Sequence, residues 1–362
     1  MILKDAFALF ILFQLFQLSS VNCQKQRYLH TATFIDNKLY ILGGNIVDKS
    51  TSLEVGREFF YLDCSLPINT QKPLWQDLTS VNIIPTHAFA ATVKGGANNN
   101  TLIFYGGRNL TNAENMALVY MFDTQTSSWY IPSISGVSFT KRRSLSAFID
   151  YNKKMYLFGG WLIGGDFVND MLILDTVNLT WGKGSSLNAP LPRINYGAVL
   201  LPSQDILYLG GEEFKNKYLP LPLNEQTFGP IPSDRYGLTA VLGLDGQQVI
   251  MFGGWNENNI STADSLYTLN LSTFRWQIPN VSGKLPNSRY YHRANVIGKY
   301  MVISFGFNFN PDVENDILLL DISNNEDKRN QHKQDQNGTE LRIPGENMNT
   351  ERVSFYAATN RI

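Results

Sequence analysis

The sequence predicts an all-β fold, a six-bladed β-propeller with four-stranded antiparallel blades, and three observations lead to it. The composition favours strands and turns, with 12% aromatic residues, 28 glycines and 15 prolines. An apolar strand that ends in a glycine pair recurs about every fifty residues. None of the repeating units shows the apolar period of a helix. A four-stranded sheet cannot bury both faces alone, whereas sheets stacked around an axis can, which favours a propeller.

The glycine pair marks the end of the second strand in each unit. Glycine at this place permits a positive φ and a close approach of neighbouring backbone. Five units keep the pair and the sixth keeps one glycine: Gly43, Gly44, Gly106, Gly107, Gly159, Gly160, Gly210, Gly211, Gly253, Gly254 and Gly306.

Three other residue types recur at fixed offsets. An Asp or Asn closes the third strand, where we expect its side chain to begin a turn by bonding to the backbone. A tryptophan follows in the fourth strand and is expected to press one blade against its neighbour. An arginine precedes the second glycine by 17 to 19 residues. The tryptophans are Trp75, Trp129, Trp181 and Trp276, and the arginines are Arg27, Arg143, Arg193, Arg235 and Arg289.

Two units depart from the pattern. The fourth is short, and Phe228 is predicted to stand where tryptophan would be. The sixth stops after its third strand (residues 314–323), so the last blade is expected to be incomplete unless residues 352–359 return to fill it. The predicted organisation is a signal peptide over residues 1–23, the propeller over 24–323 and a polar, disordered tail over 324–362, in which 352–359 can pair as a strand.

The N-terminus predicts export. An apolar run of about 12 residues from Phe7 to Leu18 is short of the ~20 that a membrane-spanning helix needs. Cleavage is expected after Cys23; the alternative is an uncleaved anchor helix. Seven N-x-S/T sequons support a secreted, extracellular glycoprotein without a membrane span after signal removal. They are Asn99, Asn109, Asn178, Asn259, Asn270, Asn280 and Asn337.

Charge and cysteine content exclude other classes. The net charge of −1 gives no field for nucleic acid or an anionic membrane. Cys23 and Cys64 are the two cysteines, and removal of the signal would leave Cys64 without an intrachain partner. A disulfide framework and a cysteine-based metal site are therefore not expected.

The chain resembles the kelch repeat. The resemblance rests on the glycine pairs and on the blocks "NDMLILDTVNLTW" (Asn169–Trp181) and "DSLYTLNLSTFRW" (Asp264–Trp276), and it covers Arg27 to Ser323. The chain is similar to secreted, fungal-type kelch propellers, which are grouped with the central domain of galactose oxidase. This resemblance implies the fold and leaves the activity open.

No catalytic motif carries over. A phosphate loop would need a helix after the glycines, and a strand follows instead. A copper-radical oxidase site would need a cysteine cross-linked to a tyrosine and several ligands that the chain does not offer. His30, His87 and His292 begin first strands and could converge on a metal; packing and hydrogen bonding is the favoured interpretation. We therefore predict no cofactor and no metal.

Recognition is the remaining function. Trp161, Trp255 and Phe307 follow the glycines at the same place in three units, where they could contact a ligand or pack locally. The recurring arginines could bind an acidic partner or pair with nearby turn carboxylates. We predict a secreted, non-catalytic module that binds an unidentified protein or carbohydrate through propeller-face loops. The alternative is a carbohydrate-active or copper-oxidase-like enzyme.

Overall fold

The protein is an all-β propeller. The computed structural model describes residues 26–46, 54–70, 72–109, 116–187, 189–214, 218–223, 227–258, 260–283, 285–308, 313–323 and 352–356. The predicted signal peptide, Asn259, Asn337 and the predicted tail other than 352–356 lie outside these ranges. Within them, helix is confined to the 3₁₀ turns η1 (Thr79–Val81) and η3 (Thr262–Asp264), so no described helix has the length or apolarity to cross a membrane.

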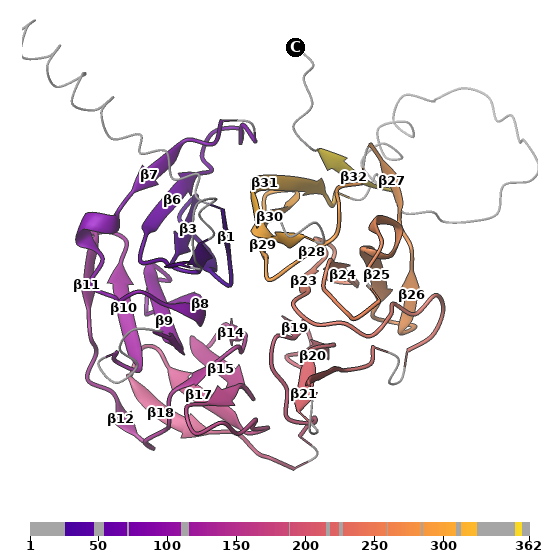
Figure 1. The fold of residues 1–362 in the computed structure, drawn as a ribbon. Coiled ribbons are helices and arrows are strands. Elements are labelled where there is room, and N and C mark those ends of the chain that lie inside the picture. Colours follow the sequence, from indigo (N-terminus) through magenta and orange to yellow (C-terminus); the bar gives the residue numbers. More distant parts are fainter. Residues whose placement is uncertain are drawn as a thin grey trace, which may run out of the picture.

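Among the described residues, five sheets contain four or more strands, and they are arranged in a ring (Figure 1). The first unit supplies β2 (Thr31–Ile35), β3 (Lys38–Leu42), β6 (Phe59–Asp63) and β7 (Trp75–Asp77). The second supplies β8 (Ala88–Gly95), β9 (Thr101–Arg108), β10 (Val119–Asp123) and β11 (Ser128–Tyr130). The third supplies β14 (Ala147–Ile149), β15 (Lys154–Phe158), β17 (Met171–Asp175) and β18 (Thr180–Lys183), with β12 (Ser135–Gly136) parallel to β18.

The later units follow the same order with two variations. The fifth supplies β23 (Thr239–Leu242), β24 (Gln248–Phe252), β25 (Leu266–Asn270) and β26 (Arg275–Gln277). The sixth supplies β28 (Arg289–Tyr290), β29 (Arg293–Ile297), β30 (Tyr300–Asn308) and β31 (Val313–Asp321), joined by β27 (Asn280–Ser282) and β32 (Arg352–Tyr356). The fourth unit forms a two-stranded sheet of β19 (Gly197–Leu200) and β20 (Ile206–Leu209).

Short ladders hold the loops that follow the glycines. They join the segment around each recurring arginine to the segment after the glycines of the same unit. The strands are β1 (Arg27–Tyr28), β4 (Asn45–Ile46) and β5 (Glu54–Val55), then β13 (Arg142–Arg143) and β16 (Trp161–Leu162). Isolated bridges from Ile194 to Glu212 and from Tyr236 to Trp255 do the same in the fourth and fifth units. In the fourth unit β21 (Glu212–Phe214) also pairs with β22 (Tyr218–Pro220).

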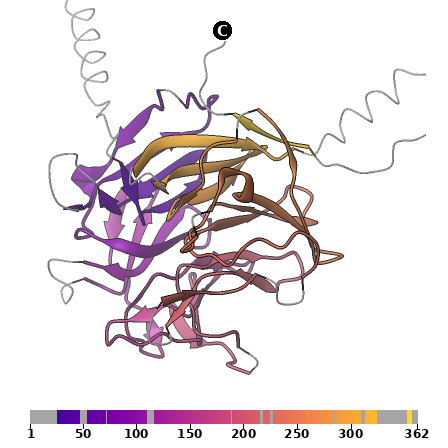
Figure 2. The same cartoon turned by 45° about the vertical axis from the view of Figure 1, so that its right-hand side comes forward.

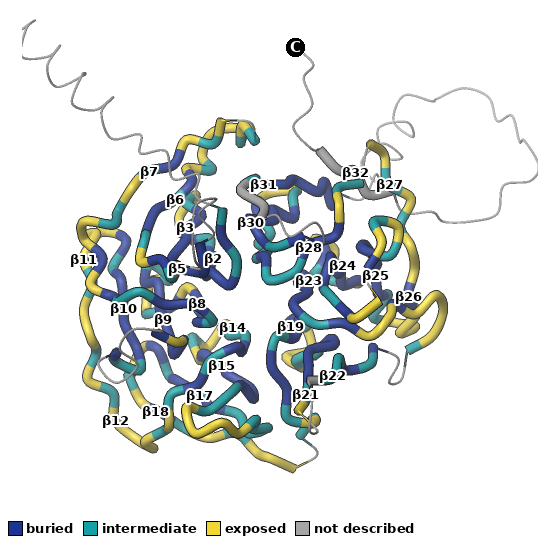
Figure 3. Tube along the Cα trace, viewed as in Figure 1, coloured by how far each residue is buried: buried dark blue, intermediate teal, exposed yellow. Residues whose placement is uncertain are grey.

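The innermost strands surround a channel and close on themselves. Each contacts the next, in the order β2, β8, β14, β19, β23, β29 and back to β2. The first and last units therefore lie side by side, as Figures 1 and 2 both show. Trp75 of the first unit stacks on Phe305 of the sixth with ring centroids 5.8 Å apart, so side-chain packing joins the first and last units. Exposed residues gather at the outer rim, away from the packed strands (Figure 3).

Six backbone hydrogen bonds form a closed ring around one end of the channel. One residue from each unit takes part, each with a left-handed φ between +52° and +67°. They are Leu29, Phe89, Ser144, Asn195, Gly237 and Tyr291. Each amide donates to the carbonyl of the preceding member, and Leu29 donates to Tyr291, with N···O distances of 2.7–3.1 Å. We call these residues the channel ring, and the side of the propeller that carries them and the glycine pairs the ring face.

The tryptophans and turn residues act as predicted. Trp129 packs on Phe59 of the preceding unit at 5.2 Å, and Trp181 packs on Tyr105 at 5.8 Å. Trp276 is fully buried in a cluster that includes Val199 of the fourth unit. In five units the side chain that closes the third strand accepts hydrogen bonds of 2.8–3.1 Å from backbone N–H groups of the following turn. The accepting residues are Asp63, Asp123, Asp175, Asn270 and Asp321.

The prediction for Phe228 was wrong. Its side chain is 61% exposed, and its backbone pairs in parallel with Arg275 in the outer strand of the fifth unit. Phe228 therefore belongs to the connection into the next unit, as β12 does in the third. In the sixth unit, β32 pairs antiparallel with β31 and parallel with β27, at the edge that the sequence left open.

Candidate functional site

The recurring arginines join neighbouring units from the inside. With Arg142 taken as the arginine of the third unit, each is at most 8% exposed. Its Nη1 donates to the carbonyl of the first glycine of its own unit, or of Phe305 in the sixth, at 2.9–3.3 Å. The backbone carbonyls of Arg193, Arg235 and Arg289 each accept from the second glycine of the preceding unit at 2.9–3.1 Å. The spacing of arginine and glycines thus encodes a relay of hydrogen bonds, which we call the arginine–glycine relay.

The first glycine of four of the five pairs lies against the backbone carbonyl of an arginine of the next unit. A Cβ on Gly253 would lie 2.2 Å from the Arg289 carbonyl oxygen, and one on Gly210 would lie 2.3 Å from that of Arg235. Both glycines also have positive φ. A side chain here would separate two units, so the pair is a packing feature and not a ligand cradle.

Four carboxylates pair with arginines of the relay. Nitrogen–oxygen distances are 2.6 Å from Arg142 to Asp170, 2.9 Å from Arg235 to Asp264 and 2.6 Å from Arg289 to Asp316, while Arg27 lies 3.9 Å from Glu58. Pairing within the protein, the alternative given above, is what the structure shows for these four. The buried arginines are already engaged and do not present a basic surface to a partner.

The arginine of the third unit is Arg142, and the assignment of Arg143 to this position was wrong. Both fit a spacing of 17 to 19 residues, and neighbours in a strand point to opposite sides. Arg142 points inward to the Gly159 carbonyl. Arg143 lies over the Trp161 ring with 3.9 Å between guanidinium carbon and ring centroid.

An aromatic surface covers the ring face over the fifth, sixth and first units. Six half-buried residues form a connected set in which adjacent ring centroids are 4.9–6.2 Å apart. They are Tyr28, Tyr236, Trp255, Tyr290, Tyr291 and Phe307, and we call them the aromatic patch. It includes two of the three aromatic residues that the sequence singled out, and Trp161 lies apart, on Arg143 and on Phe167 at 5.3 Å.

A buried glutamate lies beside the aromatic patch. Glu212 is 5% exposed, accepts a hydrogen bond from the Asn195 amide, and influences both Tyr236 and Tyr291 electrostatically. Burial raises the pKa of Glu212 to about 7. Sequence reasoning missed it, although it occupies the position after the glycine pair that Trp255 and Phe307 occupy elsewhere.

The three histidines serve the packing between strands. His30 bonds Ser304 at 3.0 Å, His87 bonds the Pro85 carbonyl at 2.7 Å, and His292 bonds Thr239 at 2.6 Å. All three are at most 1% exposed, and burial lowers the pKa of each, to about 4 for His87. Within the described ranges, no three His, Cys, Asp or Glu side chains are grouped as a metal site requires.

Other predicted positions are distributed around the surface. Asn178 and Asn280 are exposed, Asn99 and Asn270 are half-buried, and Asn109 is buried with its side chain accepting from Thr86 at 3.3 Å. Cys64 is a half-buried free thiol, and burial raises its pKa to about 11. A thiol with this pKa is protonated at neutral pH and is a poor nucleophile.

Comparison with known proteins identifies the repeat. A family model described as the KLHDC2/KLHL20/DRC7 Kelch-repeats domain matches residues 29–221 and 222–342. Host cell factor 2 of Homo sapiens is 25% identical over 57% of this chain and 29% of that protein. Kelch domain-containing protein 3 of Homo sapiens is 25% identical over 59% of each.

Two further similarities cover more of the chain. Acyl-CoA-binding domain-containing protein 4 of Arabidopsis thaliana is 27% identical over 82% of this chain and 45% of its own length. The chain thus spans less than two thirds of the length of each of these curated relatives. The solved structure of YjhT superposes with a TM-score of 0.58 at 14% identity, covering 83% of this chain and 96% of that one, which shows a shared fold. With the repeats, the propeller and the family match in agreement, the chain belongs to the KLHDC2/KLHL20/DRC7 Kelch-repeats domain family and is a kelch-repeat β-propeller.

Proposed function

We propose that this propeller is a non-catalytic module that binds a protein partner, with the aromatic patch as its contact surface. The observation that carries the proposal is the continuous set of six half-buried aromatic rings on the ring face. Tyrosine, tryptophan and phenylalanine are enriched in protein interfaces and dominate their binding energy.

The surroundings of the aromatic patch suit a binding surface. Trp255 and Tyr236 are held by a backbone bridge, and Arg289 and Tyr290 pair with the strand that ends at Asn308. Rings that are fixed before binding lose little entropy when a partner arrives. The relatives named for kelch repeats and for host cell factors support a scaffold role over an enzymatic one.

We expect weaker binding of the protein partner when rings of the aromatic patch are replaced by alanine. A partner is first captured by proximity labelling with the intact propeller and is then purified. Trp255→Ala and Tyr290→Ala should each weaken its affinity at least about tenfold, because each removes a large ring from the centre of the surface. Titration calorimetry with the purified partner measures the change.

The control is an aromatic residue remote from the aromatic patch. Tyr151 is 69% exposed in the turn between β14 and β15, at the opposite end of the strands. Tyr151→Ala should leave affinity unchanged. Equal affinities for all three variants would contradict the proposal, and so would a glycan array that gives binding where no protein partner does.

We also infer that the propeller has six blades. The fourth unit has two paired strands, but β19 contacts both β14 and β23, and Asn195 fills its own place in the channel ring. A five-bladed ring would require Ser144 and Gly237 to be direct neighbours, whereas both bond to Asn195. An experimental map with five inner strands around the channel would exclude six blades.

We further propose that the protein is secreted and glycosylated. The signal-like residues 1–23 and the exposed sequons at Asn178 and Asn280 support this proposal. Expression of the full chain in a eukaryotic host should deliver it to the medium with residues 1–23 removed, and glycosidase digestion should lower its mass. Retention of an undigestible, full-length chain inside the cells would contradict it.

A further inference from the structure

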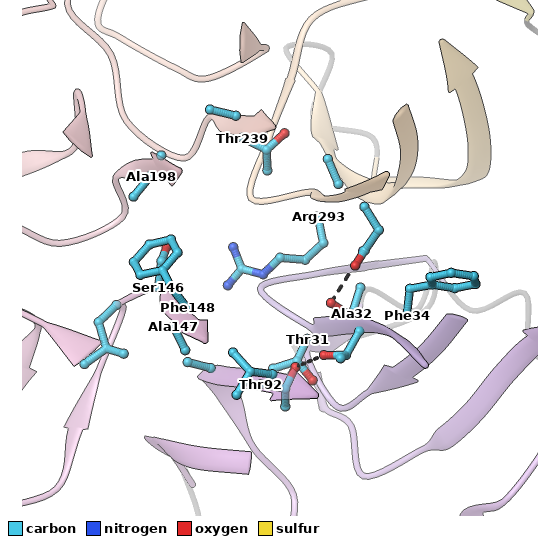
Figure 4. Close-up of a pocket in the computed structure, with 18 of the residues that line it drawn as sticks. Thr31, Ala32, Phe34, Thr92, Ser146, Ala147, Phe148, Ala198, Thr239 and Arg293 are labelled. Carbon is cyan, nitrogen blue, oxygen red and sulfur yellow. Dashed lines mark hydrogen bonds between the residues drawn. The ribbon is translucent and has the colours of Figure 1, made fainter. Parts of the chain in front are cut away.

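The central channel holds one arginine that the arginine–glycine relay does not use. Arg293 lies near the start of the innermost strand of the sixth unit, and its Nε donates to the His30 carbonyl at 3.0 Å. Among the described residues neither Nη has a hydrogen-bond or ion-pair partner. Figure 4 shows the guanidinium extended into the middle of the channel cavity, between Ser146 and Thr239. The bond to His30 fixes the direction in which the two free nitrogens point.

The cavity around Arg293 is positively charged. Its volume is about 390 Å³, and it is lined by Arg293 and Lys94 without a single Asp or Glu among the described residues. Burial lowers the pKa of Arg293 to about 10, and the positive charge of Arg293 in turn contributes to lowering the pKa of His30 and His292. Arg293 is half-buried, and an anion that pairs with its guanidinium would stabilise the charge that the protein leaves unpaired.

The walls of the cavity define what else the ligand must be. Alanines and apolar side chains, among them Phe34, Phe148 and Val296, alternate with the hydroxyls of Thr31, Thr92 and Ser146. The volume falls within the range of small-molecule sites and far exceeds that of a bare oxyanion. A planar guanidinium pairs with a carboxylate through two parallel hydrogen bonds. We propose that the channel binds a small organic carboxylate with an apolar body, its carboxylate on Arg293.

The ligand enters from the face opposite the channel ring. Beside the ring the free space shrinks to a cavity of about 10 Å³ lined by Leu29, Phe89, Tyr291 and Arg293. Lys94 lies toward the other end of the channel, where its exposed ammonium attracts anions. This site is therefore separate from the aromatic patch, and its occupancy does not depend on the proposed partner.

Benzoate, the neutral isostere benzamide and sulfate test the proposal on the purified protein. Benzoate should raise the unfolding temperature and give a calorimetric isotherm, benzamide should not bind, and sulfate should bind more weakly than benzoate. Arg293→Met should weaken benzoate binding at least about tenfold, since it removes a charge-assisted pair. Arg143→Met, on the ring face, should bind benzoate as the wild type does.

A second variant keeps the test decisive if Arg293→Met does not fold. Ala198→Leu retains Arg293 and fills part of the cavity from β19, so it should also abolish benzoate binding. The proposal is overturned if benzoate does not bind, if benzamide or sulfate binds as well as benzoate, or if benzoate binding survives in both Arg293→Met and Ala198→Leu. A loss of partner binding in the Trp255 variant leaves this result unaffected.

Discussion

Replacement of Arg235 by methionine should lower the free energy of unfolding by about 3–5 kcal/mol. Arg235 is fully buried, and every nitrogen of its guanidinium is engaged. Nη1 donates to the carbonyls of Gly253 and Asp264, Nη2 to the side chains of Ser233 and Asp264, and Nε to the Ser233 carbonyl, at 2.7–3.3 Å. Methionine matches the length of the side chain but satisfies none of these acceptors, so the carbonyls would lose their donor and the Asp264 carboxylate would lose its ion-pair partner.

Chemical denaturation followed by tryptophan fluorescence measures the loss, with Arg275→Met as the matched control. Arg275 is an exposed arginine of β26, and its replacement should change the unfolding free energy by less than about 0.5 kcal/mol. The double variant Arg235→Met, Asp264→Asn should lose less than the sum of the single variants, because the charge that Arg235 neutralises is also removed. A loss below about 1 kcal/mol for Arg235→Met would mean that the relay does not hold the units together.

The relay explains why the fold was predictable from the sequence. The spacing between arginine and glycine pair recurs because, in the five units that carry the arginine, its guanidinium bonds the backbone carbonyl at the end of the second strand of the same unit. The Trp at the fourth strand and the Asp at the turn recur for equally local reasons, contact with the preceding unit and a side-chain bond to the turn amides. Periodic sequence signals of this kind report geometry that every unit repeats.

Features that occur once were beyond this reasoning. Side chains alternate between the two sides of β13, so either Arg142 or Arg143 could point inward. The spacing between arginine and glycine pair does not decide which of them does. Arg293 lies four residues after the recurring Arg289. Whether its two terminal nitrogens find a partner depends on the side chains that the five other inner strands supply. The same holds for Glu212, whose neighbours Asn195 and Tyr291 come from other places in the chain. Phe228 was misplaced because the fourth unit departs from the repeat that was used to align it.

The aromatic patch lies between these two cases. Trp255 and Phe307 could be named from the sequence, because each follows the glycines of its unit. Tyr28, Tyr236 and Tyr290 could not, because their contacts cross between the fifth, sixth and first units. Closure of the ring therefore creates the surface that we propose as the binding site.

The contribution of Glu212 to stability should fall as the pH rises toward 7, opposite in sign to that of the three buried histidines, whose lowered pKa values make stability rise with pH. Its pKa is raised from 4.5 to about 7 by burial, so the folded state retains a proton that the unfolded chain releases. Below pH 4.5 the carboxyl is protonated in both states and its burial carries no ionisation cost. Between these two values the contribution of Glu212 becomes progressively less favourable, and above pH 7 its full loss of about 3 kcal/mol is reached.

Glu212→Gln removes this titration while it keeps an oxygen that accepts from Asn195. Its unfolding free energy should match that of the wild type near pH 4.5 and exceed it at pH 8 by up to about 3 kcal/mol. Denaturation curves at a series of pH values measure the difference between Glu212→Gln and the wild type. Parallel curves for the two proteins would show that Glu212 is ionised in the folded protein without cost. Glu212 borders Tyr236 and Tyr291. Its ionisation above pH 7 would therefore also place a negative charge beside the aromatic patch. Partner affinity should change over the same pH range in the wild type and stay constant in Glu212→Gln.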